Sequence, residues 1–267
     1  MIGEDILDLK GQVGLVTGAG QGAGRGIALM MAQHGAGGVA VNDFLIERAD
    51  AVAAEIRAMG VPAIGLQADV SDLGSVRAMV ERAKGELGTV TLLVNNAGMA
   101  GPAARMGHGA MFWEEDPSEW HKYLGTNLDG VLNCCHAVLP DMVAAKRGRI
   151  VTVVSDSGRV GEARMAVYAA AKAGAAGFVR SLAKETGRFN ITCNAISLST
   201  LQPPIEGEAL EAFLTSDQSR AQLSRYTIRR YGLPEDVGAL ALFLCSDAAS
   251  WITGQTYPLN GGYSVAV

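Results

Sequence analysis

Short apolar runs alternate with helical patterns along the whole chain, and this alternation limits the possible folds more than any single motif does. The runs predict seven strands, at residues 13–17, 38–42, 63–67, 91–94, 149–154, 191–196 and 255–258. Most of them are apolar throughout, which is typical of parallel strands covered on both faces. Helices are predicted between them, at about 22–34, 45–59, 72–87, 117–145, 165–188 and 234–246. The alternation therefore predicts an α/β fold with a doubly wound parallel sheet and helices on both faces.

The composition favours a single domain over residues 1–267. Hydrophobic residues make up 49% of the chain, and no proline- or serine-rich linker, charge block or repeat divides it. The net charge of −5 comes from interspersed acids and bases, without the basic stripe that binds nucleic acid. We therefore expect a small-molecule ligand and no nucleic-acid partner.

Patterns for targeting or metal binding are not evident. Residues 1–10 carry three acids and no apolar run, so we expect no signal peptide. No stretch approaches the ~18 apolar residues of a membrane span. The four cysteines, Cys134, Cys135, Cys193 and Cys245, have neither metal-site nor disulfide spacing. We expect reduced thiols, no metal and a cytoplasmic protein.

A glycine-rich turn at 17–24 follows the first predicted strand and opens the first predicted helix. Gly18 would allow the tight turn, Gly22 would let the backbone approach a pyrophosphate, and Gly24 would let the helix pack on the sheet. The spacing is TGxxxGxG instead of GxGxxG, so an ordinary glycine-rich turn is the competing interpretation. The position favours a dinucleotide site on a Rossmann-type fold.

Asp43 ends the second predicted strand, at about the ~20-residue offset from the glycine turn that is expected of a ribose-binding acid. A carboxylate there accepts hydrogen bonds from ribose hydroxyls and repels a 2′-phosphate. The adjacent Asn42 and Phe44 and the loop residue Gln21 supply no cation. We therefore predict NAD in preference to NADP, although a surface aspartate at a strand end is the alternative.

Two further turns lie at strand ends on the predicted cofactor side. Asp69, after the third strand, could accept a hydrogen bond from the adenine amino group or could cap the helix at 72–87. Residues 95–98, with the sequence Asn-Asn-Ala-Gly, suit a turn that passes under a cofactor. An ordinary strand-ending turn explains these four residues equally well.

Tyr168 and Lys172 indicate acid–base chemistry by a tyrosine, since they lie four residues apart on one face of a predicted helix. A free tyrosine, with a pKa of ~10, is a poor base at neutral pH. A nearby ammonium should stabilise the phenolate and lower that pKa. The competing interpretation of such a pair is a solvated helix surface.

Ser155 and Asn127 are the other two candidate catalytic residues. Ser155 ends the fifth predicted strand, where it could hydrogen-bond a substrate oxygen and orient it toward Tyr168. Asn127 lies inside the helix predicted at 117–145, where asparagine has a modest helix propensity. Holding a water in a proton relay is one reason for it, and a satisfied core amide is another.

In this order the motifs resemble those of the short-chain dehydrogenase/reductase family over nearly the whole chain. They are TGxxxGxG at 17–24, NNAG at 95–98, Asn127, Ser155, YxxxK at 168–172, Asn194-Ala195 and Leu259-Asn260-Gly261-Gly262. The resemblance implies an Asn127–Ser155–Tyr168–Lys172 tetrad and hydride transfer between a carbinol carbon and C4 of the nicotinamide. In oxidation the proton would pass from Tyr168 through the ribose hydroxyl and Lys172 to a water near Asn127.

The resemblance also implies a set of cofactor-binding residues and a homotetramer. Lys172 would hold the nicotinamide ribose. The predicted set is Gly18, Gln21, Gly22, Ala23, Gly24, Asp43, Asp69, Val70, Asn96, Ala97, Gly98, Tyr168, Lys172 and Leu201.

The chain departs from the family pattern in three places. Leu198-Ser199 stands where Pro-Gly is usual and Pro203 where threonine is common, which puts the cofactor contacts of 198–203 in doubt. Residues 99–117 form an apparent insertion around Arg105, His108, Phe112 and Trp113, which could shape substrate specificity at the active-site mouth or could be a surface or subunit-contact insertion. Asp156 and Ser157 follow the candidate serine, and a carboxylate there could alter local proton affinity or point to solvent.

The segment at about 198–231 is the predicted substrate lid. It holds the apolar residues Leu201, Ile205, Leu210, Phe213, Leu214, Leu223, Tyr226 and Ile228. With Phe112 and Trp113 they favour an alicyclic, steroid-like or acyl alcohol. The lid arginines Arg220, Arg225, Arg229 and Arg230 could meet a phosphorylated carrier, but a solvated helix face is the favoured interpretation.

Three functions are consistent with these residues. The first is an NAD-dependent dehydrogenase of secondary alcohols. The second is a 3-oxoacyl thioester reductase acting on a coenzyme A or carrier-protein substrate. The third, of a different class, is a regulatory nucleotide-binding protein, which has no evident need for the complete tetrad.

Overall fold

The computed structural model describes residues 5–98 and 111–265. Within these residues the strands form one seven-stranded parallel sheet in the order β3-β2-β1-β4-β5-β6-β7. The strands are β1 (Val13–Val16), β2 (Gly38–Asp43), β3 (Ala63–Gln67), β4 (Val90–Asn95), β5 (Gly148–Ser155), β6 (Ile191–Leu198) and β7 (Thr256–Leu259). The predicted strands are therefore confirmed, with ends shifted by at most two residues.

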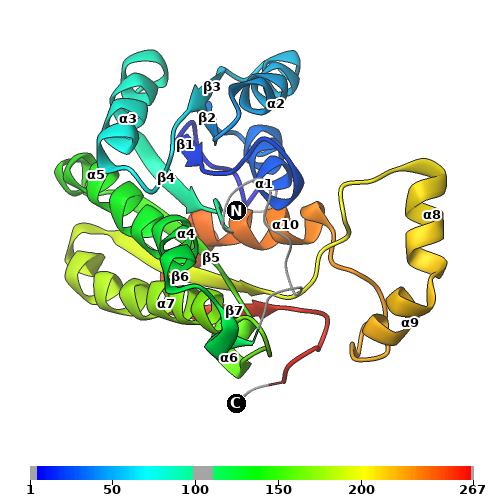
Figure 1. Ribbon diagram of the computed structural model, residues 1–267. Helices are drawn as coiled ribbons and strands as arrows, with labels where there is room; N and C mark the ends of the chain where they lie inside the picture. The colour runs from blue at the N-terminus through cyan, green and yellow to red at the C-terminus, as the bar shows by residue number, and fades with distance from the viewer. Residues whose placement is uncertain (1–4, 99–110, 266–267) are drawn as a thin grey trace.

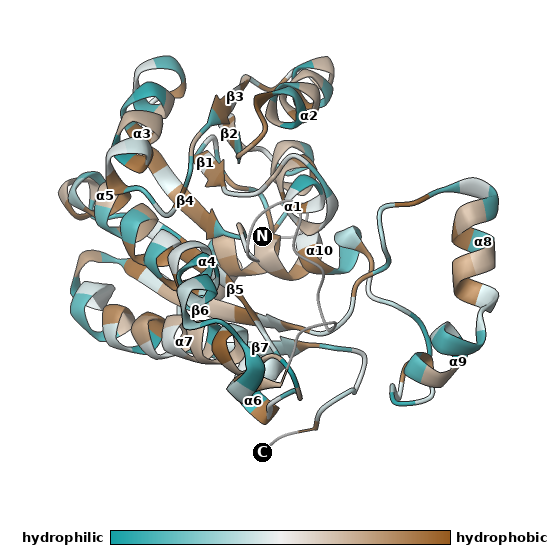
Figure 2. Cartoon of the chain, in the orientation of Figure 1, coloured by the Kyte–Doolittle hydropathy of each residue, from teal (hydrophilic) through white to brown (hydrophobic). Residues whose placement is uncertain are grey.

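Helices cover both faces of the sheet, as Figure 1 shows, which confirms the doubly wound α/β prediction. One apolar core lies under α1 (Gly22–Gln33), α2 (Ile46–Ala58) and α10 (Pro234–Cys245). The other lies under α3 (Leu73–Leu87), α5 (Gly130–Ala145) and α7 (Ala166–Thr186). Successive residues of a strand serve opposite cores, and β1 and β4 are accordingly mainly brown in Figure 2.

The prediction of one continuous helix at 117–145 is wrong, because the segment is divided into four elements. A 3-10 turn, η2 (Pro117–Glu119), leads into α4 (Trp120–Leu124), and a π-helical turn, η3 (Gly125–Asp129), separates α4 from α5. Inside η3 the Asn127 side chain donates to the Tyr123 carbonyl over 2.9 Å. That carbonyl therefore has a side-chain donor, and the wider π-turn brings Asn127 to face the core, with 0% of its surface exposed.

Part of the segment 198–231 forms an arm that stands away from the body of the molecule in Figure 1, whereas Leu198 pairs within the sheet and Tyr226 and Tyr231 are buried. It contains α8 (Gly207–Thr215) and α9 (Asp217–Leu223), and no residue of α8 is buried. A short helix, α6 (Ser157–Val160), follows β5, and 3-10 turns occur at η1 (Phe112–Glu114), η4 (Gly187–Phe189) and η5 (Asp247–Ala249). Among the described residues no helix has the length and apolarity needed to cross a membrane.

Helices α1 and α10 approach each other at two glycines. A Cβ on Gly26 would lie 2.7 Å from the Pro234 carbonyl oxygen, and one on Gly238 would lie 3.0 Å from the Gly26 carbonyl oxygen. Proline occupies the first turn of α10, and Asp236 accepts a hydrogen bond from the Leu233 N–H over 2.7 Å, so the predicted helix start is confirmed.

Gly26→Ala should lower the free energy of unfolding by about 1–3 kcal/mol, because the added methyl group overpacks the contact between α1 and α10. Gly85→Ala is the matched control, since Gly85 is an exposed residue of α3 whose added Cβ would meet no atom within 4 Å. The control should be neutral or stabilising by up to about 1 kcal/mol. Urea unfolding of both variants measures the difference, and equal effects would contradict the close-packing argument.

Candidate active site

The candidate site forms where the strand order reverses, between the carboxyl ends of β1 and β4. Thr17 joins these ends, because its Oγ1 accepts hydrogen bonds from the N–H groups of Asn96 and Ala97, each over 3.0 Å. The Asn96 amide donates in return to the carbonyls of Thr17 and Gly18, over 3.0 and 2.9 Å. The turn at 95–98 therefore holds the glycine loop in place at the topological switch point of the sheet.

The glycine loop has the shape of an anion cradle. Gly18 has a φ of +60°, and a Cβ on Gly24 would lie 2.3 Å from the Gly18 carbonyl oxygen. Gly22 has a φ of +55° and would meet nothing within 4 Å. Gln21 precedes α1 without capping it through its side chain, and the first turn carries no acid. The N–H groups at the start of α1 therefore suit the pyrophosphate of a dinucleotide.

Asp43 is fixed at the end of β2 by two backbone donors. It accepts hydrogen bonds from the N–H groups of Gly20 and Leu45, each over 3.0 Å, and only 8% of its surface is exposed. Arg48, in the first turn of α2, has its Cβ 2.5 Å from the position of a Cβ on Gly20. The side chain of Arg48 therefore begins close to Gly20 and Asp43. The sequence analysis missed this cation because it considered only the residues adjacent to Asp43 in the sequence.

Asp69 is not the cap of α3, and the alternative given for it is wrong. The N-cap is Asp72, which accepts from the Ser75 N–H over 2.5 Å. Asp69 is exposed and accepts instead from the N–H and hydroxyl of Ser71, over 2.9 and 2.7 Å. Its neighbour Val70 is buried against Gly130 of α5. Asp69 is therefore exposed at the end of β3, whereas Val70 belongs to the core.

The four residues of the predicted tetrad come from three elements. Asn127 lies in η3, Ser155 ends β5, and Tyr168 and Lys172 lie in the first two turns of α7. A Cβ built on Gly98 would lie 3.1 Å from Asn127 Oδ1 and 3.2 Å from Lys172 Nζ. The amide and the ammonium therefore both lie close to Gly98, where a side chain would crowd them.

Lys172 is buried although it carries an ammonium group. Only 4% of its surface is exposed, and Nζ donates to the Val153 carbonyl over 2.9 Å. Burial lowers the pKa of Lys172 from 10.5 to about 8. This lysine is therefore not part of a solvated surface pair, and its charge is sensitive to pH near the neutral range.

The hydroxyl groups near Tyr168 form a directed chain. The N–H and hydroxyl of Ser157 donate to Ser155 Oγ over 3.3 and 3.0 Å, which leaves the Ser155 proton free for another acceptor. Burial raises the pKa of Tyr168, and a hydrogen bond from Ser155 opposes that rise. The sequence analysis expected Lys172 to lower this pKa, but the direction is the reverse because loss of solvation dominates. Nζ lies 5.9 Å from the tyrosine ring centre.

The structure describes the predicted lid and only the last part of the apparent insertion. Leu201 is half-buried and forms a bridge with Gly232. Of the insertion, Phe112 and Trp113 are exposed, and Phe112 stacks on Trp120 with ring centres 5.4 Å apart. Arg105 and His108 lie outside the described residues. The lid arginines are exposed, and Arg220, Arg225 and Arg230 each pair with an acidic side chain.

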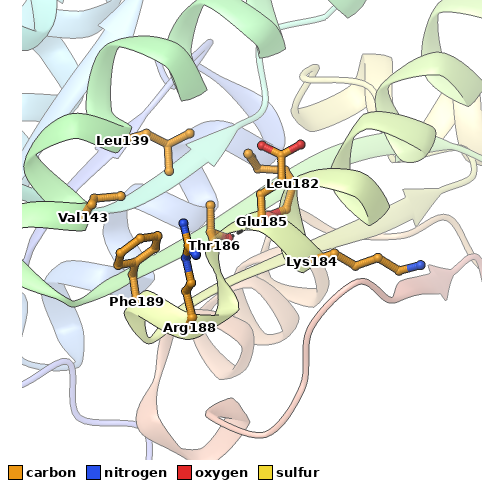
Figure 3. Close-up of a pocket in the computed structure, with 8 residues that line it drawn as sticks. All are labelled: Leu139, Val143, Leu182, Lys184, Glu185, Thr186, Arg188 and Phe189. Carbon is orange, nitrogen blue, oxygen red and sulfur yellow. Dashed lines mark hydrogen bonds between the residues drawn. The ribbon is translucent and has the colours of Figure 1, made fainter.

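Other features lie away from this site. A hollow of about 540 Å³ lies at the carboxyl-terminal end of α7, whereas Tyr168 lies at the start of that helix; Figure 3 shows the side chains that line the hollow. It is lined by Leu139, Val143, Leu182, Lys184, Glu185, Thr186, Arg188 and Phe189. All four cysteines are free and buried. Within residues 5–98 and 111–265, no group of three or more acidic, histidine or cysteine side chains could hold a metal ion.

Comparisons with known proteins agree with this geometry. A family model described as enoyl-(acyl carrier protein) reductase matches residues 18–264. The 3-oxoacyl-(acyl-carrier-protein) reductase FabG of Staphylococcus aureus is 36% identical over 93% of this chain and 96% of its own length. Cis-4-hydroxycyclohexanecarboxylate dehydrogenase of Sinomonas cyclohexanicum is 37% identical over 95% and 96%.

A solved structure extends the likeness to three dimensions. Gluconate 5-dehydrogenase from Burkholderia cenocepacia, in complex with NADP and tartrate, superposes with a TM-score of 0.86 at 30% identity, covering 98% of this chain and 99% of that one. The chain therefore belongs to the short-chain dehydrogenase/reductase family, and it is an oxidoreductase that acts on CH–OH groups with a nicotinamide cofactor.

Lys172→Met should raise the free energy of unfolding at pH 7 by about 1–3 kcal/mol, because it replaces a buried ammonium with an apolar side chain of similar length. The folded-state pKa of about 8 lies below the ordinary 10.5. The cost of burying the charge is therefore fully present below pH 8 and is lost as the pH rises toward 10.5. Urea unfolding at pH 7 and pH 9.5 should show this advantage shrinking.

Lys184→Met is the control for this experiment, since Lys184 lies on the exposed side of the same helix and its loss removes an equal charge. The control should show no comparable change between the two pH values. A Lys172→Met variant that is less stable than the wild type at pH 7 would contradict the inferred cost of burial.

Proposed function

We propose that this protein is an NAD-dependent dehydrogenase that interconverts a secondary alcohol and a ketone, with Tyr168 as general acid and base. One observation carries the proposal. The hydroxyl chain from Ser157 through Ser155 ends at Tyr168, and the buried Lys172 lies one helical turn further along α7. A solvated surface pair would have neither the burial nor the directed hydrogen bonds.

Each residue has a separate task in this mechanism. With substrate bound, the Ser155 hydroxyl, which faces Tyr168 in the structure, would turn its proton to the substrate oxygen and orient that oxygen. In oxidation Tyr168 acts as the phenolate and takes the hydroxyl proton of the alcohol, and in reduction the neutral Tyr168 gives its proton to the carbonyl oxygen. Lys172 and Asn127, which converge beside Gly98, provide the exit for that proton. A bound nicotinamide cofactor would supply the hydride acceptor or donor.

The preference for NAD rests on Asp43. Its carboxylate is held at the end of β2 by two backbone N–H groups, where it would meet the ribose hydroxyls and oppose a 2′-phosphate. Arg48 beside Gly20 is the feature that favours NADP, and the similar gluconate 5-dehydrogenase structure contains NADP. We favour NAD because Asp43 is the last residue of β2, whereas Arg48 lies five residues further along, in the first turn of α2.

An apolar or alicyclic alcohol is the proposed substrate class. Phe112 and Trp113, in the apparent insertion, and Ile205 and Ile228, in the lid, are all exposed. The similarity to a cis-4-hydroxycyclohexanecarboxylate dehydrogenase supports an alicyclic substrate, and the similarity to FabG supports the alternative, a 3-oxoacyl thioester. The regulatory alternative loses support, because the relatives named above are oxidoreductases by name.

The first test of the proposed function is an assay at 340 nm with NAD and, separately, NADP. The panel holds alicyclic hydroxy acids, hydroxysteroids and 3-hydroxyacyl thioesters. Tyr168→Phe should lower kcat by at least about 10³-fold on any active substrate, since it removes the acid/base group, with the Kd for NADH nearly unchanged. Retained turnover in this variant would overturn the role given to Tyr168. Tyr257→Phe, on β7, is the control.

Asp43→Ala combined with Phe44→Arg should shift the ratio of kcat/KM values toward NADP by at least about 10-fold, equivalent to about 1.4 kcal/mol. The change removes the repelling carboxylate and supplies a cation. Asp43→Asn is the matched control, because it keeps one acceptor oxygen for the glycine loop. A wild-type enzyme that uses NADP as well as NAD would contradict the preference, and Arg48→Ala would then identify the cation responsible.

A further inference from the structure

We propose that Asp156 is a positioning residue that holds the Ser155 turn in its active geometry by clamping three neighbouring strand ends together. The inference rests on the proposed function, because it assigns Asp156 to the support of Ser155 and Tyr168. Asp156 follows Ser155 directly, yet only 2% of its surface is exposed. The alternative that its carboxylate points to solvent is therefore wrong.

The two oxygens of the Asp156 carboxylate accept four hydrogen bonds, three from distant segments and one from the nearby Arg159. Oδ1 accepts from Ser197 Oγ over 2.8 Å and from Arg159 over 3.0 Å. Oδ2 accepts from the Asn260 amide over 2.5 Å and from Ser264 Oγ over 2.9 Å. A carboxylate that receives four hydrogen bonds in the interior is a strong and specific crosslink.

The three distant donors come from the ends of β6 and β7. Ser197 is the second-last residue of β6, just before the lid, and Asn260 and Ser264 follow β7. The Asp156 N–H also donates to the Leu198 carbonyl over 2.9 Å, which prolongs the pairing of β5 with β6. Asp156 therefore ties the end of β5 to the start of the lid and to the carboxyl-terminal segment at 260–264.

The same clamp sets the direction of the hydroxyl chain. Ser157, the residue after Asp156, can donate to Ser155 Oγ only while the turn at 155–157 keeps its shape. A displacement of about 1 Å in a catalytic group can lower the rate by about 10²-fold. Loss of the clamp should therefore reduce turnover more than it reduces cofactor binding, whose glycine loop lies on β1 and α1.

The Asp156 carboxylate faces the Asn260 amide, whose orientation is fixed by a second hydrogen bond. Asn260 Oδ1 accepts from the Gly262 N–H over 3.0 Å, so its Nδ2 must face Asp156. Asp156→Asn would place an amide nitrogen against that nitrogen in one orientation, or against Ser197 and Arg159 in the other. Combining Asp156→Asn with Asn260→Asp restores a donor facing a carboxylate, with the charge on the opposite side of the same hydrogen bond.

The experiment compares Asp156→Asn, the double variant and the wild type. We expect Asp156→Asn to lower kcat by about 10–100-fold, with little change in the Kd for NADH, and the double variant to recover about 10-fold. Asp247→Asn is the matched control, since Asp247 holds ion pairs with Lys10 and Arg149 outside the proposed site. It should lower stability and leave kcat unchanged.

Three results would overturn the proposal: an unchanged kcat in Asp156→Asn, an equal loss of kcat in Asp247→Asn, or a folded double variant no more active than the single one. If Asp156→Asn fails to fold, Ser264→Ala removes one donor and keeps the charge. A lowered kcat in that folded variant supports the clamp, and an unchanged kcat overturns it.

Hydrogen exchange separates this proposal from the proposed function. If the wild type turns over no substrate in the panel, the proposed function fails. The clamp is then judged by amide protection alone. Faster exchange at 155–160 and 261–264 in Asp156→Asn, absent in Asp247→Asn, would support it, and unchanged protection in both segments would overturn it.

Discussion

A parallel sheet leaves backbone carbonyl groups unpaired at the carboxyl ends of its strands, and the candidate site depends on how neighbouring segments satisfy them. Asn42 donates to the carbonyls of Leu66 and Ala68, over 3.1 and 3.3 Å. Asn96 does the same for the end of β1, and Lys172 for Val153. Asn96 and Lys172 thus have two roles, because they hold strand ends together and also belong to the candidate site. Each of these side chains can therefore move only by breaking a hydrogen bond to a backbone carbonyl.

Burial has opposite consequences for the two ionisable groups of the tetrad. It raises the pKa of Tyr168 and lowers that of Lys172 to about 8. Both shifts favour the uncharged forms, so a phenolate beside an ammonium does not arise from burial alone. The hydrogen bond from Ser155 is the contact that opposes the rise for Tyr168. The orientation of Ser155, and hence the shape of the turn after β5, therefore has a direct influence on the acidity of Tyr168.

Periodicity predicted the sheet and its helices, because a strand buried on both faces has few compositions available to it. The same reasoning missed the π-turn at Asn127, whose cause is a side-chain hydrogen bond to Tyr123 that leaves no periodic trace. It also missed Arg48, which reaches Gly20 only through the packing of α2 against the glycine loop. Asp156 was visible as a carboxylate, but its partners Ser197 and Asn260 are distant in sequence. Local patterns therefore predicted elements and motifs, and contacts between distant segments decided how the site is supported.

The two halves of the candidate site are held by different means, and this difference explains how one fold serves several substrates. The proposed cofactor half lies on β1, β2 and β4, whose ends are joined by hydrogen bonds between side chains and backbone groups. The substrate half includes α8, which buries no residue, and the exposed Phe112 and Trp113. Exposed side chains on such segments can change with little cost to the core. Relatives with 30–37% identity are named for an acyl carrier thioester, a cyclohexane acid and gluconate. Substrate specificity in this chain should therefore reside in the arm and the Phe112 segment, while the role proposed for Asp156 is to keep the reacting groups in one geometry.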